Sequence, residues 1–185
     1  MKKERNIALA VCAVLAALIL LLTSQSSPLY PINVWGDANC LLTVGRVMKR
    51  GGVLYRDIYE QKGPLLYLIH ALAACLSDTS FWGVYIMEAL AMTVALYAAY
   101  RLMRLRAGMG FSLGAAAFFG AAFASCTAFI RGDSAEEFCL PLLMAALAIA
   151  YAEYGRRAKP MRTKRLLVCG ALAGCVAAIK YTLLG

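Results

Sequence analysis

Residues 35–76 read WGDANCLLTVGRVMKRGGVLYRDIYEQKGPLLYLIHALAACL, and they mix carboxylates, cations, aromatic residues, glycines and a proline. Most of the remaining chain consists of apolar runs joined by short basic connectors. A long polar stretch between apolar runs is typical of a structured loop at a membrane face, and such loops often carry function. Both the fold and the function therefore depend on where this loop lies.

Composition indicates an integral membrane protein. The chain has 185 residues, of which 62% are hydrophobic, and its mean hydropathy is +0.69. Soluble domains are nearer to half apolar. The net charge of +9 sits mostly in connectors between apolar runs, where the positive-inside rule explains it, so we predict no nucleic-acid partner. The seven cysteines show neither metal-ligand nor disulfide spacing.

The apolar runs predict an all-α fold, a polytopic helical membrane bundle with about five transmembrane helices. The first run, residues 7–22, follows three cations and lacks a clear signal-cleavage site, so we interpret it as an uncleaved span. The other predicted spans are residues 81–102, 111–130, 134–154 and the run from residue 166. Because that last run is still apolar at Gly185, we expect residues 1–185 to be a single transmembrane domain, the N-terminal part of a longer protein.

Small residues recur in two of these spans, and in the span 111–130 they predict a close helix contact. Ala116, Gly120 and Ala124 fall on one helix face, and Gly170 and Gly174 form a Gly-x-x-x-Gly pair in the last span. Faces of this kind allow helix backbones to approach closely within a membrane.

The first loop, residues 24–80, contains two predicted juxtamembrane helices. Polar residues recur at helical spacing over residues 39–50, opposite an apolar face that includes Cys40. This pattern predicts an amphipathic helix on the membrane surface, ended by the glycines at 51 and 52. A second apolar run begins at Pro64 and ends at Leu76, too short for the ~20 residues that a crossing requires.

The distribution of cations predicts which side of the membrane the loop occupies. If residues 64–76 do not cross, twelve of the 19 lysines and arginines are cytoplasmic: three near the N-terminus, three at 101–106 and six at 156–165. If they do cross, the two later clusters face outward, against the positive-inside rule. We therefore predict a multi-pass protein of the cell membrane with a cytoplasmic N-terminus and an external first loop.

Seven of the ten carboxylates lie on the external side in this topology. Gathered carboxylates can act as a general base or bind a divalent metal, and both alternatives stay open; no other cofactor is indicated. Asp37 and Asp78 lie where helices begin and suit helix caps, while Ser134 and Glu137 have the spacing of a capping box. Asp133 lies in a turn and has no such structural interpretation.

Lys62 lies at the start of the second loop helix, at the level of the lipid headgroups. There it can meet a lipid phosphate, with a solvated lysine as the alternative. Tyr55, Tyr59 and Tyr67 suit an interfacial aromatic belt. His70 stands alone on an apolar helix and receives no predicted role.

The loop contains an ordered motif: Asp37, then Gly51-Gly52-x-Leu54-Tyr55-x-Asp57, then Lys62-Gly63-Pro64-Leu65-x-Tyr67. This motif resembles the first external loop of the GT-C superfamily of membrane glycosyltransferases. It is similar in particular to the branch of the protein O-mannosyltransferases and aminoarabinose transferases. The resemblance runs from the first span to the Gly-rich last span that ends in Lys180.

The resemblance implies transfer of a sugar from a polyprenyl-phosphate donor to a lipid, glycan or protein acceptor at the outer face, among membrane lipids. Two catalytic candidates follow from the resemblance: Asp37 matches the family's candidate base, and Asp133 matches the acidic position of the second external turn. Lys62 matches the lysine expected near the carrier phosphate. The other candidate substrate-binding residues are Tyr55, Asp57 and Lys180.

Two departures from the family pattern bear on the substrates. Ala38 follows Asp37 where the mannosyltransferases carry an Asp-Glu pair, which weakens the case for a protein acceptor. Gln61 precedes Lys62 where relatives carry Glu, which weakens the case for a metal site.

A non-catalytic polytopic protein, such as a scaffold or transporter subunit, is the alternative function. Transporters more often place polar groups at mid-membrane on broken spans, whereas here the predicted intramembrane charges are limited to Glu88 and Lys180. By depth, both lie about 9–10 Å below the outer face. Since an unpaired charge there costs at least about 2.5–3.5 kcal/mol, we expect the two to pair or to share a polar pocket.

Overall fold

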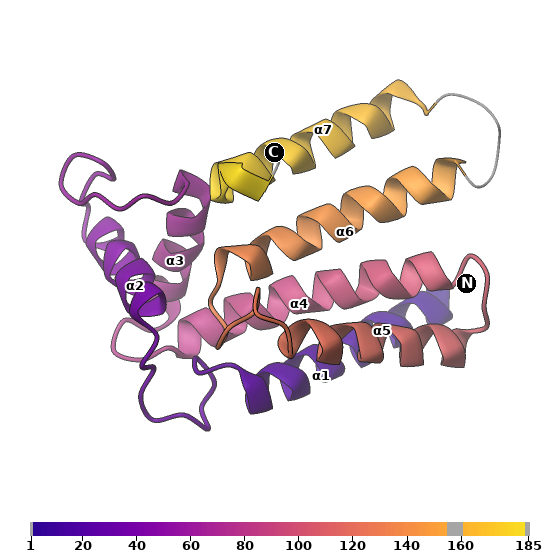
Figure 1. Ribbon diagram of the computed structural model, residues 1–185, viewed down its shortest axis with the longest axis horizontal. Helices are drawn as coiled ribbons and strands as arrows, with labels where there is room; N and C mark the ends of the chain where they lie inside the picture. Colours follow the sequence, from indigo (N-terminus) through magenta and orange to yellow (C-terminus); the bar gives the residue numbers. More distant parts are fainter. Residues whose placement is uncertain (1, 155–160, 184–185) are drawn as a thin grey trace.

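The computed structural model describes residues 2–154 and 161–183, and these residues form an all-helical bundle (Figure 1). The predicted all-α membrane bundle is confirmed. In the described part, β pairing is limited to two isolated bridges, Leu54–Ile58 and Ile130–Gly132. The elements in chain order are α1 (Lys2–Thr23), α2 (Gly36–Lys49), α3 (Pro64–Leu76), α4 (Trp82–Met103), α5 (Met109–Ala124), α6 (Ala135–Tyr154), α7 (Thr163–Ile179) and the short 3-10 helix η1 (Tyr181–Leu183).

Three helices of the described chain, α1, α4 and α6, are long and apolar enough to cross a membrane. The helices before and after α6 are shorter than the predicted spans. α5 has 16 residues and α7 has 17. After α5, the backbone has a positive φ at Ile130, Gly132 and Asp133, which a right-handed helix cannot contain. α7 ends at Ile179, so Lys180 caps the helix instead of lying inside it.

Helices α1, α4 and α5 pack through small and branched side chains. Leu96 of α4 is fully buried between them, and a Cβ at Gly120 of α5 would lie 2.7 Å from its Cδ2 atom. The predicted close contact through Ala116 and Gly120 is therefore confirmed. On α1, the fully buried residues recur every fourth position and so occupy one helix face: Ala8, Cys12, Ala16 and Leu20.

Helices α2 and α3 pack against each other at one end of the bundle (Figure 1). α2 is amphipathic as predicted, but its apolar face, which includes Leu41 and Leu42, is buried against protein, and Cys40 is exposed. Gly45 permits this contact, since a Cβ there would lie 2.4 Å from the carbonyl oxygen of His70 in α3. The predicted ends also agree, because α2 stops at Lys49 and α3 starts at Pro64.

Helix α6 packs on α4 and on α7. The Gly-x-x-x-Gly pair of α7 does not mediate this packing, because a Cβ at Gly170 or Gly174 would meet no described atom within 4 Å. No described helix contacts α7 closely through these two glycines. They face away from the bundle.

The two ends of the bundle differ in the residues that they present. Figure 1 shows the N-terminus, the α4–α5 connector and the start of α7 at one end, and α2, α3 and the last turn of α7 at the other. Two predicted basic clusters therefore share one end. Of the third cluster, Arg156, Arg157 and Lys159 lie outside the described residues. The polar first loop occupies the opposite end.

Glycine 45 provides a test of the α2–α3 contact. Gly45→Ala should lower the thermal unfolding midpoint by about 2–10 °C, because overpacking costs about 1–3 kcal/mol and this shifts the midpoint by a few degrees per kcal/mol in a chain of this size. The measurement is thermal unfolding of the purified protein in detergent. Gly170→Ala is the matched control and should not lower the midpoint, since its Cβ meets open space. Equal losses in both variants would contradict the contact.

Candidate active site

The predicted site residues gather at the end of the bundle where α2 and α3 lie. Asp37 is in the first turn of α2, and Lys62 immediately precedes the Gly63-Pro64 start of α3. Asp133 lies in the turn between α5 and α6, and Lys180 caps α7. Segments far apart in the sequence thus meet at one end of the bundle. The predicted site residues nevertheless differ greatly in their exposure to solvent.

Asp37 and Lys62 form an ion pair, with 3.6 Å between the Asp37 Oδ2 and Lys62 Nζ atoms. The Asp37 side chain is 59% exposed and that of Lys62 is 20% exposed. Asp37 is not the helix cap, because Trp35 occupies the cap position of α2 and no side chain caps this helix. The pair therefore presents an accessible acid beside a half-buried cation.

Two tyrosine hydroxyls hold the backbone of Lys62. The Lys62 N–H donates to the Tyr67 hydroxyl oxygen at 2.7 Å, and the Tyr55 hydroxyl donates to the Lys62 carbonyl at 2.9 Å. Tyr67 is fully buried and donates its own proton to Glu60. Burial and the Glu60 carboxylate both raise the pKa of Tyr67, so its hydroxyl stays protonated. The position of Lys62 is thereby fixed from both sides.

Gly63 joins this loop to the end of α7. Its N–H donates to the carbonyl of Ile179 at 3.0 Å, and a Cβ at this position would lie 2.0 Å from the carbonyl oxygen of Ala178. Only glycine allows so close an approach of the two backbones. The Gly-Pro pair of the motif therefore has two local functions: glycine docks the loop on α7, and proline begins α3.

Asp57 serves the loop itself. Its carboxylate pairs with Arg56 at 2.8 Å and accepts the Val53 N–H at 2.7 Å. The Arg56 hydrogen bond, together with that of Val53, lowers the pKa of Asp57. These contacts close the turn before Lys62.

Lys180 pairs with Glu136 of α6, and the expected partnership with Glu88 is wrong. Helix α7 ends one residue before Lys180, so the lysine lies beside the start of α6, where Glu136 is in the first turn. Both side chains are partly exposed. Asp78 likewise pairs with Lys49 at 2.8 Å instead of capping α4, whose N-cap is Phe81.

A buried polar cluster lies under the loop, and it consists of Ser24, His70, Glu88, Asp133 and Glu137. Ser24 donates to Glu88, with contacts of 3.0 and 2.9 Å to the two carboxylate oxygens. The Asp133 N–H donates to both Glu88, at 2.6 Å, and Glu137, at 3.0 Å. His70 Nε2 lies 2.7 Å from Asp133 Oδ1.

Glu137 partly matches the predicted capping box. Its N–H donates to the Ser134 hydroxyl at 3.2 Å, as the box requires. Its carboxylate, however, accepts from the Asp133 N–H, one residue earlier than the box predicts. The turn residue Gly132 has a φ of 86°, and a Cβ there would lie 2.3 Å from Ser24 Oγ. The cluster therefore determines the shape of this turn.

His70 is the functional candidate that the sequence did not indicate. A single histidine on an apolar helix carries no signal of its own, and its partner Asp133 is 63 positions away in the sequence. Both side chains are almost completely buried, so Asp133 faces His70 and not the surface. Burial lowers the pKa of His70 and Asp133 raises it, with a net upward shift. Burial raises the pKa of Asp133, and His70 opposes this.

Within residues 2–154 and 161–183, no group of three or more His, Cys, Asp or Glu side chains is placed to hold a metal ion. The acids of the loop and the cluster are instead engaged with cations, hydroxyls and backbone N–H groups.

An all-helical membrane bundle with an acid–lysine pair at one end suits a GT-C membrane glycosyltransferase, and comparison with protein families agrees. The family described as dolichyl-phosphate-mannose-protein mannosyltransferase matches residues 61–184. The chain belongs to this family, and the predicted GT-C superfamily is confirmed. No curated protein and no solved structure gave a significant match. The matched range includes Lys62, Asp133 and Lys180, whereas Asp37 precedes it.

The His70–Asp133 pair predicts a specific pH dependence of stability. Both groups have raised pKa values in the folded protein, so the native state binds more protons than the unfolded state once the pH exceeds about 4 for Asp133 and about 6.5 for His70. Stability from the pair should be present below these ordinary values and be lost as pH rises through the folded ones.

The test compares the wild type with a His70→Gln/Asp133→Asn double variant. The difference in unfolding midpoint, wild type minus variant, should decrease between pH 5 and pH 8.5. A difference that is constant or that grows with pH would contradict the assigned shifts.

Proposed function

We propose that this protein transfers a sugar from a polyprenyl-phosphate-linked donor to an acceptor at the external face of the cell membrane. The observation that carries the proposal is the Asp37–Lys62 pair, an accessible carboxylate beside a cation whose backbone is fixed. Membership of a GT-C glycosyltransferase family supports the reaction class over a scaffold or transporter subunit.

Each member of the pair has a distinct chemical task. The acceptor hydroxyl or amine attacks the anomeric carbon, the bond from that carbon to the phosphate oxygen breaks, and its electron pair leaves with the polyprenyl phosphate. Asp37 accepts the proton of the acceptor, as a positioned general base does. The Lys62 ammonium stabilises the negative charge on the leaving phosphate. Binding of the donor phosphate to Lys62 would also release Asp37 from its ion pair.

The remaining candidates support this pair in different ways. Tyr55 positions Lys62 by donating to the Lys62 carbonyl, and Tyr55 itself is 47% exposed, so it also offers the donor an apolar surface. Asp57 shapes the loop. Lys180 pairs with Glu136 at the same end of the bundle, and it is a second cation that can bind the donor phosphate. Because Asp133 is fully buried against His70, we assign it to positioning the α5–α6 turn and not to proton transfer.

The acceptor and the branch of the superfamily follow from the loop motif. We place the protein in the branch of the O-mannosyltransferases and aminoarabinose transferases, with a lipid, glycan or protein as the acceptor. Ala38 stands where the mannosyltransferases carry the second acid of a pair, and this favours a lipid or glycan acceptor. A mannosyl- and an aminoarabinosyl-phosphoryl-polyprenol are therefore the two donors to compare.

Asp37→Asn tests the assigned base. In the full-length enzyme this change should lower the rate of polyprenyl phosphate release by about 10²–10⁴, the usual effect of losing a general base, and leave donor binding intact. Release of the carrier phosphate is measured in membranes that supply the native acceptor, so the acceptor need not be identified in advance.

Asp78→Asn is the matched control, since it removes a carboxylate from the same external loop and breaks only the pair with Lys49. Turnover should stay within about two-fold, because exposed ion pairs contribute little. Near-wild-type turnover of a folded Asp37→Asn variant would show that Asp37 is not the base.

The proposed orientation predicts which residues react with an external thiol reagent. In a background without the seven native cysteines, Arg56→Cys should be labelled in intact cells and Arg106→Cys only after the membrane is opened. The two positions lie in the first loop and in the α4–α5 connector, at opposite ends of the bundle. Labelling of position 106 from outside would refute the orientation.

A further inference from the structure

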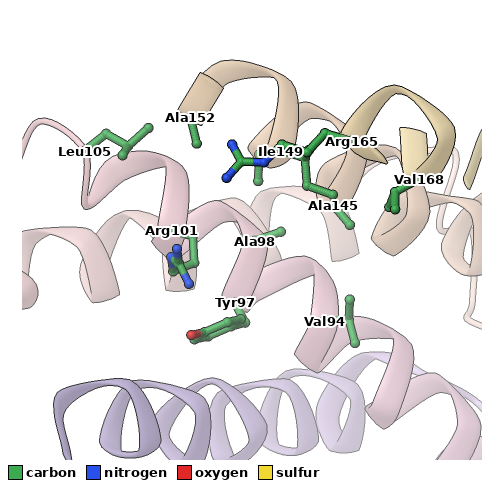
Figure 2. Close-up of a pocket in the computed structure, with 11 residues that line it drawn as sticks. Val94, Tyr97, Ala98, Arg101, Leu105, Ala145, Ile149, Ala152, Arg165 and Val168 are labelled. Carbon is green, nitrogen blue, oxygen red and sulfur yellow. The ribbon is translucent and has the colours of Figure 1, made fainter. Parts of the chain in front are cut away.

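Two adjoining hollows lie at the end of the bundle opposite to Asp37 and Lys62. The first, here called the apolar groove, has a volume of about 440 Å³ and lies between α4, α6 and α7 (Figure 2). The second, the basic hollow, has a volume of about 520 Å³ and lies between α4 and the start of α1. They share Tyr97, Arg101 and Leu105, so an apolar surface passes directly into a basic one.

The apolar groove has the length of part of a lipid chain within one leaflet. Its wall on α4 runs from Val94 to Arg101, about 10 Å of helix, and Leu105 extends this wall beyond the end of α4 at Met103. The helical part is about a third of a hydrocarbon core roughly 30 Å thick, so the groove lies within one leaflet. The opposite walls are apolar as well, and Figure 2 shows Ala145, Ile149 and Val168 facing this space.

The basic hollow has an excess of positive charge. Its carboxylate, Glu4, is already occupied, because it pairs with Arg104 at 2.8 Å and accepts the Tyr100 hydroxyl at 3.2 Å. Within the described residues, Lys2, Arg5 and Arg101 make no ion pair with a carboxylate. Three cations are therefore left for an anionic ligand.

Arg101 joins the two surfaces. It lines both hollows, and its guanidinium carbon lies 6.0 Å from the centre of the Tyr97 ring on the same helix. Arg165, at the α7 side of the groove, is neutralised by Glu153. Of the two arginines that line the apolar groove, Arg101 is therefore the one whose positive charge is not neutralised by a described carboxylate.

We propose that the apolar groove and the basic hollow together bind one anionic phospholipid, with its phosphate at Arg101 and one acyl chain along α4. A free phosphate ion would leave the groove unused, and an apolar helix would leave the cations unpaired. A lipid with both an anionic headgroup and an acyl chain satisfies both surfaces, and clustered cations at a membrane face attract such lipids. This site is separate from the proposed sugar-transfer site and does not depend on it.

Native mass spectrometry of the full-length protein in detergent tests the headgroup part of the proposal. Dioleoyl phosphatidylglycerol should be retained more tightly than dioleoyl phosphatidylcholine, which has the same chains and no net charge. Arg101→Ala should weaken phosphatidylglycerol binding by at least about ten-fold, the effect of losing a charge-assisted hydrogen bond. Arg106→Ala removes an equal charge at the same end but lines neither hollow, so its effect should be much smaller.

The acyl-chain part has its own pair of variants. Ala145→Phe fills the groove and should weaken phosphatidylglycerol binding, whereas Leu147→Phe, at an exposed position of α6 outside the groove, should not. In the wild-type protein, phosphatidylglycerol with a photoreactive acyl chain should label residues 94–105 or 145–152, which needs no variant to fold.

Three results would overturn the proposal. They are equal retention of the two lipids, equal losses for Arg101→Ala and Arg106→Ala, or labelling by the photoreactive chain only elsewhere. The second would reduce the effect to general surface charge, and the third would mean that something other than a lipid chain covers the groove.

Discussion

Burying Glu88 inside an apolar helix constrains the structure around the candidate site. A carboxylate in such surroundings is costly unless its oxygens accept hydrogen bonds. Ser24, just after α1, donates to Glu88, and the Asp133 N–H before α6 donates to it as well. To deliver that N–H, the chain adopts positive φ at Gly132 and Asp133. The ends of three helices are thus joined through one carboxylate.

The same network extends outward to the loop. Asp133 meets His70 on α3, and α3 begins directly after the Lys62-Gly63 dipeptide. The buried cluster therefore fixes the helix that carries Lys62 at its start, while Tyr67 on the same helix holds the Lys62 backbone N–H. The position of Lys62, and with it the Asp37–Lys62 pair, therefore depends on buried polar contacts. Apolar packing alone specifies direction and depth much less sharply than hydrogen bonds do.

Features that follow local rules were predictable from the sequence. The Gly51-Gly52 end of α2, the Pro64 start of α3 and the Ser134 cap each depend on a few neighbouring residues. The spacing of small residues also identified the buried face around Gly120, since a contact face is a property of one helix. The family resemblance rested on the order of a loop motif, which a chain retains whatever its packing.

Features that depend on which segments meet were not predictable. His70 has no distinctive neighbours in the sequence, and its role appears only when Asp133 is brought to it. The apolar run predicts a longer last helix with Lys180 inside it, whereas α7 ends at Ile179 and Lys180 pairs with Glu136. Gly170 and Gly174 show the converse case, a contact pattern that no described helix uses. Nothing in the local sequence distinguishes that pair from Gly120.

The hydrogen bond from Gly63 to Ile179 has a consequence for the order of assembly during synthesis. Gly63 and Ile179 are 116 positions apart, yet their hydrogen bond fixes the backbone directly after Lys62. At about 5–20 residues per second, roughly 6–23 s separate the appearance of Gly63 from that of its partner. Until then the loop lacks its dock on α7, even if α2 and α3 have already packed together. A nascent chain therefore passes through an interval in which the first helices are in place and the lysine of the candidate site is not yet fixed.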